Sequence, residues 1–289
     1  MYVPDFEYYA PDSVAEVCKM LTDFGARAKI FAGGTDLLPN MKHGLIAPEV
    51  LISLKNICEM KKIEYVQGKG VVIGGRSTHN DIVFSEVLEK KYKSVCSAAK
   101  SMAANQIRHL GTLAGNIASS IPSADLPPIL IALNSTVTLV GPKGARSIPL
   151  EEVFVTVRKT CIEPNEVLTE VIIPDQTMTG SKYFKFALRK SGALATVGVA
   201  AAVQVEGKTI KDARIALGAV SPTPVRAPNA EKFLIGKEAS DDVFEEAGKI
   251  ACGECKPITD FRASAEYRTD MVRVFTKRAL SEAVNNGHI

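Results

Sequence analysis

The sequence predicts an α+β protein made of three consecutive units, the last of which contains an antiparallel sheet. A chain of 289 residues is too long for one small core, so two or three packed units are expected. Helical spacing of apolar residues alternates with short strand-like runs in the first part of the chain, and long strand-like runs follow the polar stretch at residues 175–181. We therefore expect units at residues 1–57, 58–176 and 177–289.

Composition and charge exclude several classes of protein. Hydrophobic residues make up 46% and charged residues 23%, which is the balance of a compact globular chain. The 35 Lys and Arg exceed the 32 Asp and Glu only slightly and form no block or stripe, so no nucleic-acid partner is expected. The N-terminus lacks a signal-peptide pattern, no apolar stretch is long enough to span a bilayer, and the six cysteines are mostly far apart. We expect a cytoplasmic protein without a membrane partner.

The first unit is predicted to open as strand, helix and strand, followed by a loop and another strand. Ser13 with Glu16 three positions later has the form of a capping box, and apolar residues then repeat at helical spacing up to Phe24. Residues 28–32 form a short apolar run that leads directly into two glycines, and residues 50–54 form another. These runs predict two buried strands on either side of a glycine-containing loop.

The second unit combines a hairpin with helices and strands. Its opening is a hairpin at residues 64–73, where a glycine-containing turn separates two strand-like runs. Alanine-rich and apolar stretches predict helices, whereas alternating residues predict strands. The expected elements are helices at residues 94–104 and 126–133 and strands at residues 136–140 and 167–173.

The third unit is predicted to begin with long strands and to end in a helix. Strand-like runs occupy residues 183–188, 197–205 and 210–220, and the last two are joined at a glycine turn. Ser264 is placed to cap a C-terminal helix that carries apolar residues on or near one face. An antiparallel sheet with a helix is the expected arrangement.

The sharpest local feature is the run at residues 30–37. An apolar strand there meets Gly33 and Gly34, then the hydroxyl of Thr35 and the carboxylate of Asp36. Glycines permit a turn whose amide hydrogens point at one anion, and the threonine adds a hydroxyl donor, so the segment suits a diphosphate. An ordinary turn at a strand exit is the alternative that these residues alone leave open.

A second polar segment, residues 106–119, is predicted to be a loop between two apolar helices. It is rich in small and hydroxyl residues and leads to residues 122–128, where Asp125 could cap the next helix or accept hydrogen bonds from ligand hydroxyls. Two such segments in separate units suggest a crevice that grips a long ligand with a phosphate in its middle.

These two segments together resemble the paired flavin-binding motifs of the xanthine dehydrogenase and carbon monoxide dehydrogenase family. The first motif reads Ala-Gly-Gly-Thr-Asp-Leu-Leu from residue 32, and the second reads Gly-Thr-Leu-Ala-Gly-Asn-Ile from residue 111. The likeness continues to residues 277–280 and covers essentially the whole chain. It implies a two-part FAD-binding unit of the vanillyl-alcohol-oxidase and molybdenum-hydroxylase type, followed by a C-terminal α+β domain with an antiparallel sheet.

The resemblance also implies a set of FAD-binding residues. In this family the first glycine loop holds the diphosphate, the second lies along the diphosphate and flavin, and a later carboxylate binds the sugar-like part. A lysine beside the ring would stabilise the reduced flavin, although a solvated strand lysine is the alternative for Lys185. The implied residues are Ala32, Gly33, Gly34, Thr35 and Asp36 with Lys29, Phe31 and Leu37 at the first loop; Thr112, Gly115, Asn116 and Ser119 at the second; Asp125 at the sugar; and Met102, Leu168 and Lys185 near the ring.

The function implied by the resemblance is an electron relay. A partner subunit oxidises its substrate at molybdenum, a small subunit passes the electrons through [2Fe-2S] clusters, and the FAD of this chain delivers them to an external acceptor such as NAD. His109 and the pair Ala193-Leu194 depart from residues common in relatives, which leaves the acceptor open. The alternatives are a free-standing FAD oxidoreductase and a cofactor-free assembly or scaffold protein, and the intact glycine loops argue against the latter.

No metal site and no catalytic residue beyond the flavin are expected in this chain. Cys252 and Cys255 are the only close cysteine pair, and they offer fewer ligands than zinc or an iron–sulfur cluster needs. The cysteine-rich insertion that holds an additional cluster in some relatives has no counterpart, because residues 134–141 pass straight through.

Overall fold

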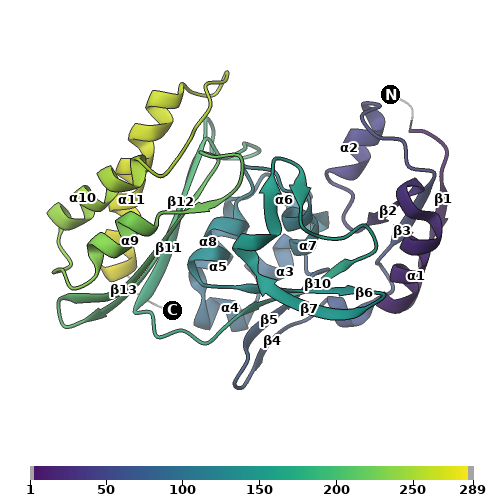
Figure 1. Ribbon diagram of the computed structural model, residues 1–289, viewed down its shortest axis with the longest axis horizontal. Helices are drawn as coiled ribbons and strands as arrows, with labels where there is room; N and C mark the ends of the chain where they lie inside the picture. The colour runs from purple at the N-terminus through teal and green to yellow at the C-terminus, as the bar shows by residue number, and fades with distance from the viewer. Residues whose placement is uncertain (1–2, 286–289) are drawn as a thin grey trace.

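The computed structural model describes residues 3–285, which form three units side by side along the molecule (Figure 1). The N-terminal unit lies at one end, the helices and sheet of the middle unit follow, and the C-terminal sheet with its helices forms the other end. The predicted α+β class is confirmed, whereas the division at residues 57 and 176 stays a prediction. In the described range no helix is long and apolar enough to cross a membrane.

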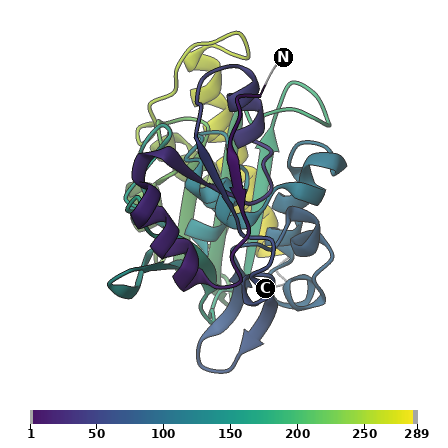
Figure 2. The same cartoon turned by 90° about the vertical axis from the view of Figure 1, so that its right-hand side faces the viewer.

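The N-terminal unit is a three-stranded parallel sheet, ordered β1-β3-β2, with α1 packed beside it (Figure 2). The side chain of Ser13 caps α1 as predicted, but the Glu16 carboxylate accepts the amide of Asp12 and leaves the capping box half formed. The predicted loop between β2 and β3 contains a helix that the sequence reading missed. The elements are β1 (Glu7–Tyr9), α1 (Val14–Phe24), β2 (Ala28–Phe31), α2 (Leu37–Lys42) and β3 (Val50–Ser53).

The middle unit is a five-stranded antiparallel sheet, ordered β4-β5-β10-β6-β7, with short helices packed against it. The β4–β5 hairpin projects from the lower edge of the molecule (Figures 1 and 2). The strands of the middle sheet are β4 (Ile63–Val66), β5 (Gly70–Gly74), β6 (Thr136–Gly141), β7 (Gly144–Pro149) and β10 (Val167–Ile173). A separate hairpin consists of β8 (Phe154–Thr156) and β9 (Lys159–Thr160). The helices of the middle unit are α3 (His79–Val83), α4 (Glu86–Lys91), α5 (Lys93–Ser101), α6 (Asn105–Leu110), α7 (Leu113–Ala118) and α8 (Leu126–Ala132).

The C-terminal unit is a four-stranded antiparallel sheet, ordered β11-β12-β13-β14, that is covered on both faces. Along β12, Val197 and Val199 face the core shared with α9–α11, whereas Ala200 and Ala202 face the core shared with α5 and α8 (Figure 1). Burial on both faces explains the near-continuous apolar strand. The elements are β11 (Gly180–Phe186), β12 (Val197–Glu206), β13 (Thr209–Gly218), β14 (Val225–Arg226), α9 (Pro228–Leu234), α10 (Asp241–Cys252) and α11 (Ala265–Asn285).

Small residues bring the C-terminal sheet close to the middle unit. A Cβ built on Gly218 would lie 2.7 Å from Cγ of Pro128 in α8. Within the sheet, Gly198 leaves room for the Tyr183 side chain of the neighbouring strand β11, because a Cβ there would lie 2.8 Å from the Tyr183 hydroxyl. Alanines at residues 200, 202 and 216 line the same face. Because larger side chains would push the sheet away, these residues fix the distance between the two units.

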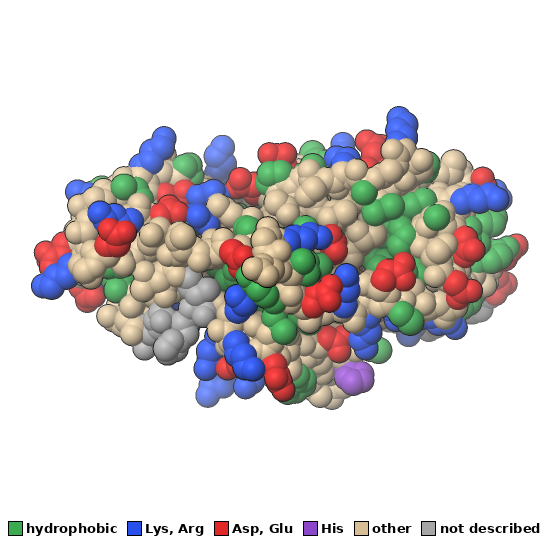
Figure 3. All heavy atoms as spheres, turned by 90° about the horizontal axis from the view of Figure 1, so that it is seen from below, with side chains coloured by type: hydrophobic (Ala, Val, Ile, Leu, Met, Phe, Trp, Pro, Cys, Tyr) green, Lys and Arg blue, Asp and Glu red, His purple; other side chains and the backbone are tan. Residues whose placement is uncertain are grey.

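Charges of both signs are interspersed on the face seen from below (Figure 3). Hydrophobic side chains gather toward the right of that view, at the end of the N-terminal unit. This face carries no continuous basic stripe, in keeping with the nearly balanced composition.

Candidate cofactor-binding site

The first glycine loop begins where β2 ends. Phe31 is the last residue paired with β3, and the carboxyl ends of parallel strands are a common place for ligands to bind. Gly34 has φ +70°, and a Cβ there would lie 2.6 Å from the Phe31 ring, so the turn requires glycine at this position. The amide hydrogens of Gly33, Gly34 and Thr35 donate to no group within residues 3–285. The loop therefore has free amide donors, which an anion could accept.

The second polar segment was predicted as a loop, but it folds into α6 and α7, which meet at Gly111 and Thr112. Thr112 caps α7 by accepting the amide of Gly115 at 3.2 Å. The amides of Leu113 and Ala114 donate to the main-chain oxygens of Ser77 and Gly75, which follow β5, so this segment is held beside the end of that strand. Most backbone amides of this segment thus already donate hydrogen bonds within the protein. Contacts from this segment to a ligand would come from exposed Gly115 and from side chains.

The two glycine segments touch each other at Gly33. A Cβ built on Gly33 would lie 2.0 Å from the carbonyl oxygen of Leu110 and 3.0 Å from Cα of Gly111. No side chain fits in that space, and the backbones of the two units can approach only because residue 33 is glycine. The structure thus brings together the two segments that the sequence suggested would line one crevice.

A third group of residues joins the middle and C-terminal units. Both oxygens of the Asp125 carboxylate accept hydrogen bonds, one from the Tyr183 hydroxyl at 2.9 Å and one from Lys185 Nζ at 2.8 Å. Lys185 also donates to the carbonyl oxygen of Ser101 at 3.1 Å. Asp125 makes no side-chain bond to the helix that it precedes, and the Lys185 side chain is 9% exposed, so neither the capping nor the solvated-lysine alternative holds.

Burial governs the electrostatics of this group. It raises the pKa of Asp125 from its usual value, and the nearby Lys185 ammonium and Tyr183 hydroxyl oppose that shift. Burial also raises the pKa of Tyr183 well above its usual value, so its hydroxyl remains a proton donor. The Asp125 and Lys185 charges balance each other in a region that excludes water.

Strained backbone surrounds the same region. Among the described residues outside glycine, Ala103, Ser120, Arg158 and Ala219 are four of the five with positive φ. The carbonyl oxygen of Ala103 accepts the amide of Gly192, that of Ser120 accepts the amide of Arg158, and the amide of Ala219 donates to Pro122. Such conformations persist where surrounding contacts enforce them, and they concentrate at functional sites.

The other predicted residues lie around these contacts with different exposures. Lys29 is exposed on β2, and Phe31, Ala32, Asp36 and Leu37 are half-buried next to the first loop. Met102 and Leu168 are buried. Ser119 ends α7 and donates its hydroxyl to the Asn116 carbonyl oxygen, whereas the buried side-chain oxygen of Asn116 has no hydrogen-bond partner within residues 3–285.

Tyr183, Arg158 and His79 were not predicted as site residues. Tyr183 is two positions before Lys185 on one strand and therefore on the same face, which is a signal that the sequence contained. His79 is buried beneath the second segment, and its amide donates to the carbonyl oxygen of Gly111 at 3.0 Å. Nothing in the sequence distinguished His79 or Arg158.

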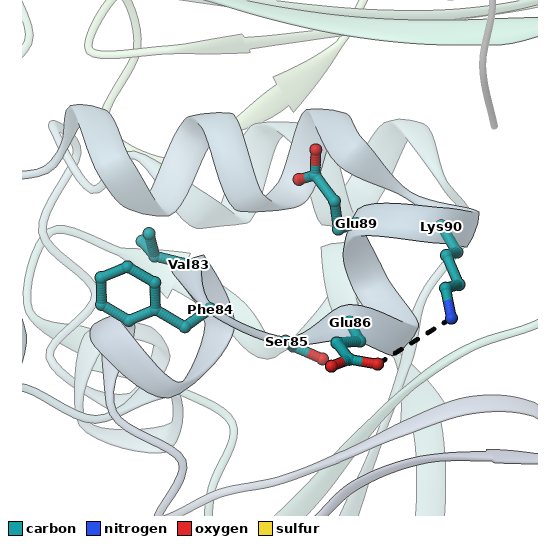
Figure 4. Close-up of a pocket in the computed structure, with 6 residues that line it drawn as sticks. All are labelled: Val83, Phe84, Ser85, Glu86, Glu89 and Lys90. Atoms are coloured by element: carbon teal, nitrogen blue, oxygen red, sulfur yellow. Dashed lines mark ion pairs between the residues drawn. The ribbon is translucent and has the colours of Figure 1, made fainter.

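Two surface hollows lie beside α3 and α4, and the larger one is also lined by His109 of the second segment. One has a volume of about 570 Å³ and is lined by residues such as Thr78, Asn80 and Phe84. The other is formed by Phe84, Ser85 and the start of α4, where Glu86 and Lys90 form an exposed ion pair (Figure 4). Neither is lined by the glycines of the two segments.

Comparison with known proteins identifies the family. Residues 4–176 match the domain described as "FAD binding domain in molybdopterin dehydrogenase", and residues 182–283 match "CO dehydrogenase flavoprotein C-terminal domain". The chain belongs to the FAD-binding medium subunits of the molybdenum hydroxylase family. As one of these medium subunits, it is part of an oxidoreductase, and FAD is its cofactor.

Full-length relatives support the assignment of this medium subunit. It is 37% identical to the carbon monoxide dehydrogenase medium chain of Hydrogenophaga pseudoflava over 98% of both chains. It is 27% identical to a xanthine dehydrogenase FAD-binding subunit of Escherichia coli O157:H7, over 96% of this chain and 95% of the relative. A solved structure of carbon monoxide dehydrogenase from Hydrogenophaga pseudoflava matches with TM-score 0.95 and 36% identity, over 99% of this chain and 100% of that chain.

The observed geometry is compatible with FAD. Free amides at the first loop suit the diphosphate, and the Gly33 contact leaves no side chain between the two segments. The unpartnered oxygen of Asn116 is a hydrogen-bond acceptor for which a bound ligand can provide the donor. The residues present therefore fit the cofactor that the family carries.

Proposed function

We propose that this medium subunit relays electrons from the iron–sulfur clusters of a small partner subunit to an external acceptor such as NAD. A large subunit with the molybdenum cofactor would oxidise the substrate. The proposal is supported by the full-length likeness to medium chains of carbon monoxide dehydrogenase and of nicotine 6-hydroxylase. The observation that supports it in this chain is the close approach of Gly33 to Leu110, which brings the two glycine segments together.

Each predicted residue has a proposed role in holding FAD. The amides of the first loop would bind the diphosphate, and the second segment would lie along the diphosphate and flavin. Asp125 would accept hydrogen bonds from sugar hydroxyls with the carboxylate lone pairs that Tyr183 and Lys185 do not use. The first-loop residues are Lys29, Phe31, Ala32, Gly33, Gly34, Thr35, Asp36 and Leu37; those of the second segment are Thr112, Gly115, Asn116 and Ser119; Met102, Leu168 and Lys185 would line the ring.

The chain itself contributes binding, orientation and electrostatics. When bound, FAD supplies a group that accepts single electrons and releases a pair. Lys185 has three protons, of which two are committed to Asp125 and Ser101, so one remains for a ligand. Because Asp125 pairs with Lys185, these two residues would present a dipole and a proton donor to the ring in place of an unpaired cation.

Rapid mixing of the reduced native complex with NAD tests the relay. The flavin and iron–sulfur absorption should recover together in the wild-type complex, whereas in a Gly33→Val complex without FAD the clusters should stay reduced. Reoxidation of the clusters at an unchanged rate without FAD would refute the relay. Recovery with a quinone but not with NAD would retain the relay and replace the acceptor.

A further inference from the structure

The β8–β9 hairpin connects the two glycine segments. Ser120, just after α7, accepts the amide of Arg158 at 2.9 Å and donates its hydroxyl to the carbonyl oxygen of Thr156 at 2.9 Å. From the tip of this hairpin, the Arg158 guanidinium reaches to 3.5 Å from Oδ2 of Asp36 in the first loop. The hairpin is therefore anchored at one segment and contacts the other.

The backbone at the hairpin tip is unfavourable for arginine. Arg158 has φ +57°, a conformation in which glycine or asparagine is preferred in tight turns. Ser120, to which it is bonded, also has positive φ, at +46°. Strain of this kind costs on the order of 1 kcal/mol or more, persists where surrounding contacts enforce it, and concentrates at functional sites.

Asp36 poses an electrostatic problem for an anion site. Asp36 follows Gly33, Gly34 and Thr35, with their free amides, directly in the chain, and a carboxylate so close to the loop would repel a diphosphate bound there. Arg158 is the cation that pairs with it. The two side chains are 54% and 43% exposed, so their pairing contributes little to folding stability, and its importance would lie in binding an anion.

We propose that Arg158 is a further residue of the cofactor site, whose guanidinium neutralises Asp36 so that the first loop accepts the FAD diphosphate. Arg158 acts through Asp36 and is therefore a positioning residue. The inference rests on the proposed placement of the diphosphate at the first glycine loop. It links residues 122 positions apart, from segments that the family motifs do not connect.

The test measures FAD binding to the FAD-depleted full chain through the quenching of flavin fluorescence. Arg158→Gln should raise the FAD dissociation constant about fivefold, because an exposed ion pair contributes up to about 1 kcal/mol. Arg158→Lys keeps the charge and should recover most of the affinity. The loss in Arg158→Gln should shrink as salt rises, because counter-ions screen the exposed carboxylate.

A double-mutant cycle separates the role of charge neutralisation from other roles. If Arg158 acts through Asp36, Asp36→Asn/Arg158→Gln should bind FAD within about twofold of Asp36→Asn alone. An equally large effect of Arg158→Gln in both backgrounds, or no effect in the wild type, would overturn the inference. The matched control is Lys159→Gln, which removes a neighbouring exposed cation that has no ion pair in the described structure.

A further variant distinguishes this inference from the proposed function. Retention of FAD by Gly33→Val would remove the basis of the diphosphate placement, whatever Arg158 does. Loss of FAD in Gly33→Val together with unchanged binding in Arg158→Gln would refute only the role of Arg158.

Discussion

The ammonium of Lys185 lies 2.8 Å from the carboxylate of Asp125, and this ion pair joins β11 of the C-terminal unit to the start of α8 in the middle unit. Their side chains are 9% and 4% exposed, and the residues are 60 positions apart in the sequence. The C-terminal unit therefore does more than cover the FAD-binding unit. It supplies a charged group to the buried junction where the cofactor is expected.

Lys185→Met should strongly destabilise the FAD-free chain. The substitution leaves the Asp125 carboxylate buried without its counter-charge, which costs about 3 kcal/mol when one partner of a buried pair is removed. Asp125→Asn/Lys185→Met should recover much of that loss, because no uncompensated charge remains. Urea denaturation measures the free energy of unfolding, and a double variant as unstable as the sum of the two single variants would contradict the account.

Lys182→Met is the matched control for this prediction. Lys182 is on the same strand and pairs with Glu282, but their side chains are 34% and 37% exposed. Removal of this exposed ion pair should lower the free energy of unfolding by less than about 1 kcal/mol.

Gly33→Val should abolish stoichiometric FAD binding. Its side chain would occupy the space that the Leu110 carbonyl oxygen fills, and the two glycine segments would have to separate. Flavin absorption of the purified chain after incubation with FAD measures the effect. Gly253→Ala is the control, because its Cβ would make an ordinary contact at 3.4 Å, and a fully loaded Gly33→Val chain would disprove the site.

Acidification below pH 6.5 should destabilise the protein through His79. Burial, assisted by the nearby charge of Arg108, lowers the pKa of His79 from 6.5 to about 4. The unfolded chain therefore binds a proton that the folded chain does not between these values, and stability falls as pH falls through that window. At the acidic end of this window, the loss in the free energy of unfolding reaches about 3 kcal/mol.

Two histidine variants isolate this contribution from that of the carboxylates. His79→Gln should lose part of the pH dependence of the unfolding free energy between pH 6.5 and 4, whereas His43→Gln at an exposed position should keep it. Equal pH dependence in both variants would rule out a buried neutral histidine.

Cys252 and Cys255 should be unreactive thiols without a metal. Burial raises the pKa of both, and Cys252 donates to the carbonyl oxygen of Thr269 at 3.1 Å. Limited alkylation of the native chain followed by mass spectrometry should label exposed Cys58 first. Stoichiometric zinc or iron in the isolated chain, lost in Cys252→Ala, would contradict this expectation.

Several elements with enough residues to reveal a period were predicted from the sequence. The capped helix α1 and the strands β10 and β12 are present where their patterns placed them, and so is the C-terminal helix α11. By contrast, α2, α6 and α7 have six residues each, fewer than two helical turns, so their glycines and polar residues favoured a loop prediction. The helices α9 and α10 were also missed, although Ser240 caps α10.

The site was predictable only where a local motif marks it. The paired glycine segments indicated a shared crevice, and their resemblance to one family indicated FAD. The contacts between Asp125 and Lys185 and between Asp36 and Arg158 depend on how distant segments pack, and no local pattern encodes them. The sequence therefore indicated the glycine loop and the charged residues Asp36, Asp125 and Lys185, but not Arg158 or the ion pairs that these residues form.

The most direct test of the relay is native mass spectrometry, with metal analysis, of the complex purified from its host through this chain. We predict one FAD on this chain, together with a molybdenum subunit and an iron–sulfur subunit. A chain that carries FAD but brings no metal-containing partner, or one that contains no FAD at all, would contradict the account.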